Sequence, residues 1–298
     1  MQSRRIGDVR VSAIGLGGMP MSIEGRPHER QSIATIHAAL EAGITLIDTA
    51  DAYHVTAHGV GHNESLIARA VASYPGDTSD VLIATKGGHL RPGDGAWTVN
   101  GSPEYLKRAC EASLQRLGVE AIGLYQFHRP DPRVPYVESV GALRDLLDEG
   151  KIRMAGISNA NPDQIRLANV VLGGRLASVQ NQLSPAFRSS EPELELCTDL
   201  GIAFLPWSPL GGISQAADLG SRFGEFAAVA GVHGVSPQQV CLAWLLAKAP
   251  VVVPIPGSTH PETIRDSAAA ADLRLSAEEL GRLDGPTGGV ADDLPTTA

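Results

Sequence analysis

Four side chains that can exchange protons stand at or just after the ends of short apolar runs in this sequence. Asp48 ends the run 44–47 and Tyr53 follows on the next loop, while Lys86 and His128 end two later runs. Each has a simpler explanation on its own, because such residues often cap a turn, pack, or find a structural partner. If the fold brings all four to one cleft, they form a set suited to proton transfer.

The chemistry of such a set follows from the residue types. A tyrosine has an unperturbed pKa of about 10 and is therefore a protonated donor at neutral pH. A lysine ammonium beside Tyr53 favours the phenolate, and an acid such as Asp48 holds the lysine charged and in place. His128 can donate a hydrogen bond to the same substrate oxygen. This set would protonate an oxygen on which negative charge develops, as when a hydride attacks a carbonyl, and the hydride implies a nicotinamide cofactor.

The elements that must position these residues repeat along the chain. Short β-branched runs alternate with segments of helical period, whose starts carry Ser-Pro or Asn-Pro pairs and whose ends carry glycine. Regular alternation with short connections predicts parallel strands and right-handed crossovers. The expected strands are 11–16, 45–48, 81–86, 122–128, 153–158, 178–182, 203–207 and 251–254.

Eight strand–helix units in 298 residues predict an α/β fold, a (β/α)₈ TIM barrel forming a single domain over 1–298. An open doubly wound sheet usually carries G-x-G-x-x-G after its first strand, but Pro20 stands where the third glycine belongs. We also expect an N-terminal β-hairpin that turns at Gly7, and a flexible C-terminal tail over 285–298. Long βα loops at the C-terminal face are expected at 54–63, 87–101 and 208–224.

Composition excludes several classes of protein. The formal net charge of -9 argues against a nucleic-acid partner. No apolar run is long enough to cross a membrane, and no signal peptide opens the chain, so we expect a cytoplasmic protein without a membrane partner. Cys110, Cys197 and Cys241 fall in predicted helices and are expected to be buried and reduced. We expect a monomer or a weak homo-oligomer.

A histidine series raises the question of a metal site. His54, His58 and His62 have the spacing of one helix face, which could hold a metal ion. Gly59 and Gly61 interrupt that helix. We therefore predict no metal site here.

An ordered set of motifs spanning residues 11 to about 284 resembles the aldo-keto reductases. The resemblance implies reduction of aldehydes or ketones, with NADPH bound first and extended across the barrel mouth. It assigns the catalytic tetrad to Asp48, Tyr53, Lys86 and His128, with Tyr53 as the general acid. The motifs are 43–53, 83–86, 125–128, 156–159, 179–182, 206–212 and 254–258.

The same resemblance implies the cofactor contacts. Ser158, Asn159 and Gln180 match residues that bind the nicotinamide carboxamide, and Trp207 matches an aromatic residue that stacks on the ring. Backbone N–H groups of 208–211 would hold the pyrophosphate. The full set of expected cofactor-binding residues is Gly18, Met19, Asp48, Ser158, Asn159, Gln180, Trp207, Ser208, Pro209, Leu210, Gly211, Ile255, Gly257, Ser258, Thr259, Thr263, Asp266 and Ser267.

One departure from the family bears on the choice of cofactor. NADPH-preferring relatives usually carry lysine or arginine in and just after the last motif, whereas this chain has none there before Arg265. We expect NADPH with a weaker hold on its 2'-phosphate, and NADH as an alternative. Asp266 and Ser267 match the positions that read adenine.

Two other functions fit the same barrel. Lys86 could form a Schiff base as in an aldolase. The chain could instead be a non-catalytic, NADPH-binding regulatory protein, because some relatives resemble channel subunits. The substrate pocket is expected to include Met19, Met21, Trp97 and Arg129.

Overall fold

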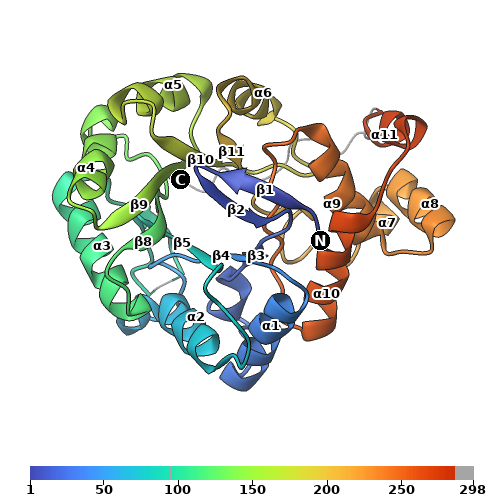
Figure 1. Cartoon of the computed structure of the whole chain (residues 1–298), viewed down its shortest axis with the longest axis horizontal. Coiled ribbons are helices and arrows are strands. Elements are labelled where there is room, and N and C mark those ends of the chain that lie inside the picture. Colours follow the sequence, from blue (N-terminus) through green and yellow to red (C-terminus); the bar gives the residue numbers. More distant parts are fainter. Residues whose placement is uncertain (94, 286–298) are drawn as a thin grey trace.

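A curved parallel sheet surrounded by helices forms the body of the molecule (Figure 1). The computed structural model describes residues 1–93 and 95–285. The strand order is β11-β10-β9-β8-β5-β4-β3, so strands that follow one another in the barrel are neighbours in space. The bounds are β3 Leu16–Gly17, β4 Leu46–Asp48, β5 Leu82–Gly87, β8 Ile122–Phe127, β9 Ile152–Ser158, β10 Leu176–Gln180 and β11 Ala203–Phe204.

The barrel closes through a segment that is not a regular strand. On one side, Val253 donates its backbone N–H to the carbonyl of Phe204 at 2.9 Å. On the other side, the carbonyls of Pro254 and Pro256 accept backbone hydrogen bonds at 2.9 Å from Gly15 and Gly17. Proline has no N–H, so these two residues cannot donate toward β3. The (β/α)₈ fold is confirmed, but its predicted last strand is reduced to isolated bridges.

A β-hairpin covers the amino-terminal end of the barrel strands. Strands β1 (Ser3–Ile6) and β2 (Val9–Ser12) pair antiparallel, and Gly7 turns between them with a φ of 55°. In Figure 1 the hairpin crosses the centre of the ring, and Ile6 belongs to the hydrophobic cluster inside the barrel. The predicted first strand over 11–16 is therefore wrong. Ser12 ends β2 by hydrogen bonding to Ile14 and Thr45, and the barrel strand begins only at Leu16.

Helices alternate with the barrel strands and cover their outer face. The predicted helix starts are confirmed, since Ser102, Asn161 and Ser236 each accept a backbone hydrogen bond from the first turn. The covering helices are α1 Glu29–Glu41, α2 His62–Ser73, α3 Pro103–Leu117, α4 Tyr136–Asp148, α5 Pro162–Val171, α6 Glu191–Leu200, α9 Pro237–Lys248 and α10 Pro261–Ala269.

Shorter elements decorate the connections. A small hairpin follows β5, 3-10 turns follow β3, β4 and α10, and three further helices lie between β11 and the end of the described chain. These elements are η1 Met19–Met21, η2 Ala57–Gly59, β6 His89–Leu90, β7 Thr98–Val99, α7 Leu219–Arg222, α8 Gly224–His233, η3 Ala270–Asp272 and α11 Ala277–Leu283.

Three expectations from the sequence concern the cysteines, membrane-spanning segments and the C-terminal tail. The cysteines in α3, α6 and α9 are buried and free, as predicted. Over residues 1–93 and 95–285, no helix combines the length and apolar character that a bilayer span requires. Apart from Gly285, the tail predicted to be flexible lies outside the described residues.

Gly87, the last residue of β5, gives a test of how tightly this strand packs. A Cβ at this position would run into the hydroxyl of Tyr125, which is buried and donates to the carbonyl of Leu106 at 3.1 Å. Gly87→Ala should lower the free energy of unfolding by about 1–3 kcal/mol, measured by urea denaturation. Gly141→Ala is the control, because a Cβ there meets nothing within 4 Å in α4 and should add about 0.5–1 kcal/mol. Equal effects of the two changes would contradict this account.

Candidate active site

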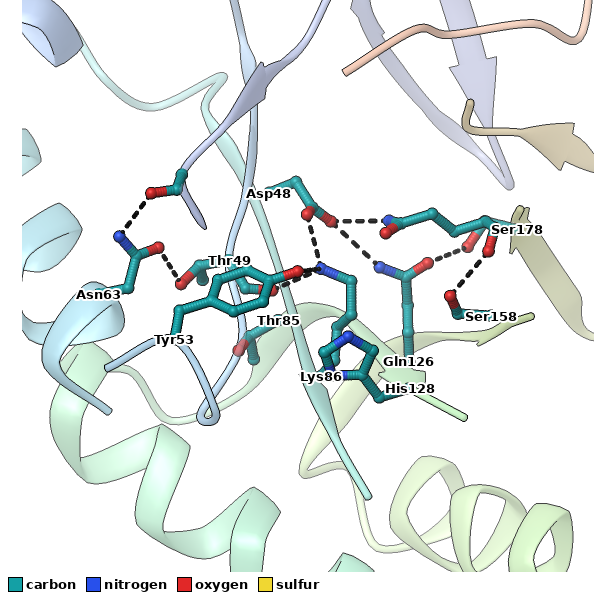
Figure 2. A network of polar contacts seen from close by, with 12 residues as sticks. Asp48, Thr49, Tyr53, Asn63, Thr85, Lys86, Gln126, His128, Ser158 and Ser178 are labelled. Atoms are coloured by element: carbon teal, nitrogen blue, oxygen red, sulfur yellow. Dashed lines mark hydrogen bonds and ion pairs between the residues drawn. The ribbon is translucent and has the colours of Figure 1, made fainter. Parts of the chain in front are cut away.

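A buried ion pair forms the centre of the site (Figure 2). The ammonium of Lys86, at the end of β5, lies 2.6 Å from Oδ1 of Asp48, at the end of β4. Their side chains are 0% and 3% exposed. Lys86 also donates to the carbonyl of Thr49 at 2.8 Å and to the hydroxyl of Tyr53 at 3.2 Å. The ammonium therefore uses all three of its donors, and the Tyr53 hydroxyl is tied directly to a cation.

The second carboxylate oxygen of Asp48 is held from the opposite side of the barrel. Gln180 of β10 donates to Oδ2 at 2.8 Å, and Gln126 of β8 lies 3.4 Å from the same atom. The hydroxyl of Ser178 in turn donates to Gln126 at 3.3 Å. Residues from strands β5, β8 and β10 thus hold the carboxylate of Asp48 inside the barrel, where a charge without partners would be costly.

Tyr53 keeps its proton at neutral pH. Burial raises the pKa of its phenol above the ordinary value, and the charge of Lys86 pulls the pKa down without cancelling that effect. Burial alone would lower the pKa of Lys86, but Asp48 and Tyr53 outweigh burial and raise the pKa. The pair is therefore a protonated phenol beside an ammonium that keeps its charge.

His128 completes the group at the end of β8. Its ring meets the Tyr53 ring edge-on, with centroids 5.8 Å apart. Burial, followed by the charge of Lys86, lowers the pKa of His128 well below its ordinary value, so the imidazole is neutral. Its Nδ1 is buried and has no hydrogen-bond partner among the residues that the structure describes. The fold thus brings the four predicted catalytic residues together. The Nδ1 atom of His128 could still form a hydrogen bond with a ligand.

A cavity of about 630 Å³ opens over this group at the carboxyl ends of the strands. Tyr53, Asp48 and His128 line it, whereas Lys86 lies behind them. Most of the residues predicted to bind a cofactor line the same cavity. They are Met19, Asp48, Ser158, Asn159, Gln180, Trp207, Ser208, Pro209, Leu210, Ile255, Gly257, Ser258, Thr259 and Thr263.

Four predicted cofactor residues do not line the cavity. The backbone N–H of Gly18 donates to the carbonyl of Asp48 at 2.7 Å, and that of Gly211 donates within its own turn. Both carboxylate oxygens of Asp266 accept hydrogen bonds at 2.6 Å from the cap and first turn of α9, and Ser267 is buried. These four residues therefore do not line the cavity, and their roles in cofactor binding stay predictions.

Two strained residues mark the cavity. Asn159 and Ser208 have φ angles of 56° and 48°, a backbone region that costs free energy for residues other than glycine. Asn159 is held by hydrogen bonds from its amide to the carbonyl of His128 and to the Ser158 hydroxyl, both at 3.0 Å. Such strain is typical of ligand-binding positions whose side chains must point in a fixed direction.

The lining residues also fit an extended nucleotide cofactor. The indole Nε1 of Trp207 is buried without a hydrogen-bond partner among the described residues. At Gly212, with a φ of 100°, the nearest atom to an added Cβ would be Ser208 Oγ at 4.0 Å, so the backbone is open to close approach. An aromatic face near the tetrad and an open glycine turn beyond it suit a flat ring and a phosphate respectively.

Comparison with known proteins assigns the chain to a family. The model described as Aldo/keto reductase family matches residues 13–286. The chain belongs to the aldo/keto reductase family. It is 35% identical over 280 residues to 6-dehydroglucose reductase of Novosphingobium aromaticivorans, covering 91% of this chain and 90% of that protein. It is 35% identical over 298 residues to probable aldo-keto reductase 1 of Glycine max, covering 91% and 84%.

Solved structures agree with that assignment. An aldo/keto reductase from Klebsiella pneumoniae, crystallised with NADP and acetate, shares 29% identity with a TM-score of 0.79, covering 95% of this chain and 94% of that one. A glycerol dehydrogenase from Gluconobacter oxydans shares 28% identity with a TM-score of 0.81, covering 95% and 94%. Membership in this family of oxidoreductases, and a relative with NADP bound, support a nicotinamide cofactor.

Sequence reasoning missed one residue that contacts Asp48 and several residues that line the cavity. Gln126 of β8 lies two residues before His128, so strand periodicity places both side chains on one face and could have identified it. The β6–β7 hairpin also contributes His89, Thr98 and Val99 to the cavity wall. No local sequence pattern predicts these contacts. Met21, expected in the pocket, packs in the hydrophobic core instead.

Two of the three histidines that were considered as possible metal ligands form hydrogen bonds within the fold. His54 Nδ1 lies 2.7 Å from the carbonyl of Thr56, and His62 Nδ1 lies 2.8 Å from the hydroxyl of Ser22. Within residues 1–93 and 95–285, no group of three or more histidine, cysteine or acidic side chains could hold a metal ion.

A second buried carboxyl lies behind the tetrad. Asp51 accepts a hydrogen bond from the Tyr105 hydroxyl at 3.2 Å, while its Oδ1 has no partner among the described residues. Burial, followed by the nearby charge of Glu64, raises the pKa of Asp51 to about 8. The folded protein therefore keeps a proton on Asp51 at pH values where the unfolded chain has lost it.

Asp51 gives a pH-dependent test of stability. The native proton on Asp51 contributes stability that is complete below about pH 4 and is lost as pH rises toward 8. Asp51→Asn cannot ionise, so the stability of the variant relative to the parent should rise by up to about 1.4 kcal/mol per pH unit in this window. Denaturant unfolding between pH 5 and 8 measures the difference. A flat difference for Asp51→Asn would contradict the assignment.

Proposed function

We propose that this aldo/keto reductase reduces an aldehyde or ketone to an alcohol with NADPH, and that Tyr53 is the general acid. The hydrogen bond from the Lys86 ammonium to the Tyr53 hydroxyl, at 3.2 Å, carries the proposal. This contact places a protonated phenol at the cavity wall with a cation behind it. That arrangement suits donation of a proton to an oxygen that gains negative charge.

The cofactor would lie along the residues that line the cavity. Ser158, Asn159 and Gln180 would hold the carboxamide, Trp207 would cover the nicotinamide ring, and residues 208–210 and 212 would face the pyrophosphate. When bound, NADPH supplies the hydride. Side chains of this protein would polarise the carbonyl and supply the proton.

The tetrad divides the proton chemistry among its members. Tyr53 and His128 would both donate hydrogen bonds to the carbonyl oxygen, which polarises the carbonyl bond. As negative charge builds on that oxygen, Tyr53 transfers its proton, and the Lys86 ammonium stabilises the phenolate that remains. Asp48 holds Lys86 charged and in position throughout.

The raised pKa of Lys86 disfavours the aldolase alternative. A Schiff base requires a neutral amine, and this ammonium is held by three acceptors. A purely regulatory, NADPH-binding role does not account for the complete tetrad, and it predicts tight binding without turnover. We also propose that the chain is one catalytic domain that works in the cytoplasm as a monomer or weak homo-oligomer. Its substrate would be a small carbonyl compound.

Tyr53→Phe tests the role of the phenol. Removing the hydroxyl should lower kcat by about 10²–10⁴-fold, because the general acid is lost. Binding of NADPH, followed by fluorescence quenching, should persist. Tyr74→Phe is the matched control, since Tyr74 packs against His37 away from the cavity. Activity of Tyr53→Phe equal to that of the control on a panel of aldehydes, ketones and oxidised sugars would refute the mechanism.

Cofactor preference can be tested at the start of α10. The first cation in this region, Arg265, is already paired with Glu41 at 2.9 Å, and Thr263 lines the cavity without charge. Thr263→Arg should raise the ratio of kcat/KM for NADPH over NADH by about 10-fold, because a guanidinium can bind the 2'-phosphate. Thr263→Gln, polar but uncharged, serves as the control. If both variants change the ratio equally, charge at this position does not set the preference.

A further inference from the structure

The wall of the cavity beyond the tetrad is formed by the β6–β7 hairpin and by Arg129. His89 and Trp97 of the hairpin have ring centroids 4.6 Å apart, and His89 meets the ring of His128 edge-on at 4.9 Å. Arg129 follows His128 directly in the chain and lines the same cavity. A substrate bound at His128 would therefore extend toward these side chains.

This wall is braced from outside the cavity. The guanidinium of Arg91 lies over the Trp97 ring at 4.7 Å. Arg91 also donates to the carbonyl of His54 at 2.5 Å and to the carboxylate of Glu24 at 2.6 Å. Its charge is thus compensated by Glu24, and the hairpin is held in place before any substrate arrives.

Arg129 carries a positive charge in the cavity that no described residue compensates. Among the described lining residues, the ionised side chains are Asp48 and Arg129, and Asp48 is paired with Lys86. His128 is neutral, and burial followed by the charge of Arg129 lowers the pKa of His89 to about 4, so that ring is neutral too. Within residues 1–93 and 95–285, Arg129 forms no ion pair. Its hydrogen bond is a 3.5 Å contact with the side-chain oxygen of Asn159.

We propose that Arg129 binds a carboxylate of the substrate, so that this reductase acts on carbonyl compounds that carry an acid group a few bonds from the carbonyl. The inference deepens the proposed function and rests on it. A guanidinium presents paired donors that match the geometry of a carboxylate. In a protein with a net charge of -9, a free cation at the substrate end of the cavity would attract such an anion locally.

The position of Arg129 separates this role from binding of the cofactor phosphates. The phosphates are expected along 208–212 and near Ser258 and Thr263. Arg129 instead contacts Asn159, which is assigned to the nicotinamide end, and adjoins His128. A carboxylate at Arg129 would lie beside the carbonyl that Tyr53 and His128 polarise.

Paired substrates test the inference in the full-length protein with NADPH. The pairs are 4-oxobutanoate with 4-oxobutanamide, and 4-carboxybenzaldehyde with 4-formylbenzamide, because a primary amide matches a carboxylate in shape but has no charge. We expect Arg129→Met to lower the carboxylate-to-amide ratio of kcat/KM by about 10- to 100-fold. The loss should appear mainly in KM for the acid. Arg166→Met, on the exposed face of α5, is the matched control.

A binding measurement separates failure of this inference from failure of the proposed function. In calorimetry on the NADP⁺ complex, butanoate should bind more tightly than butanamide, and Arg129→Met should remove that advantage. Loss of the advantage supports the inference even if no aldehyde is turned over, which would refute only the reductase assignment. Equal binding of the acid and the amide by the parent protein would overturn the inference. A carboxylate-to-amide ratio that Arg129→Met leaves unchanged would also overturn it.

Discussion

The buried ion pair between Lys86 and Asp48 constrains the rest of the structure. Both charges are removed from water, which costs several kcal/mol per ion unless hydrogen bonds replace the lost hydration. The barrel supplies those bonds from Thr49, Tyr53 and Gln180, on different strands and loops. The catalytic geometry is therefore also the arrangement that makes the charges tolerable. The phenol lies where it does partly because the ammonium needs a third acceptor.

Much of this arrangement could be predicted from the sequence, because apolar runs that end in polar residues are a local signal. Parallel topology then brings Asp48, Lys86 and His128 to one face without further information. The predicted strands were wrong where the local sequence pattern and the hydrogen bonds formed in the fold disagree. The run 11–16 is mostly apolar, but Ser12 within it turns the chain. Prolines at 254 and 256 prevent a regular last strand.

The walls of the cavity were less predictable for a physical reason. His89 meets the ring of His128 edge-on, and Arg91 lies over Trp97. These contacts depend on how the β6–β7 hairpin folds back, which sequence periodicity does not describe. Asp51 lies within the motif 43–53, but its protonation could not be predicted from the sequence because it depends on burial beside Glu64. In the proposed function, residues at the ends of the barrel strands carry out the reaction, and the β6–β7 hairpin and Arg129 determine which substrates can enter.

The seam of the barrel has a consequence for how the protein is made. Gly15 and Gly17, near the beginning of the chain, hydrogen bond to Pro254 and Pro256, near its end. During synthesis, β3 and β11 must stay as open sheet edges until this segment leaves the ribosome, and loop closure then joins distant parts of the chain. The segment also supplies Gly257 and Ser258 to the cavity. The cavity is therefore complete only after this late segment has joined the barrel.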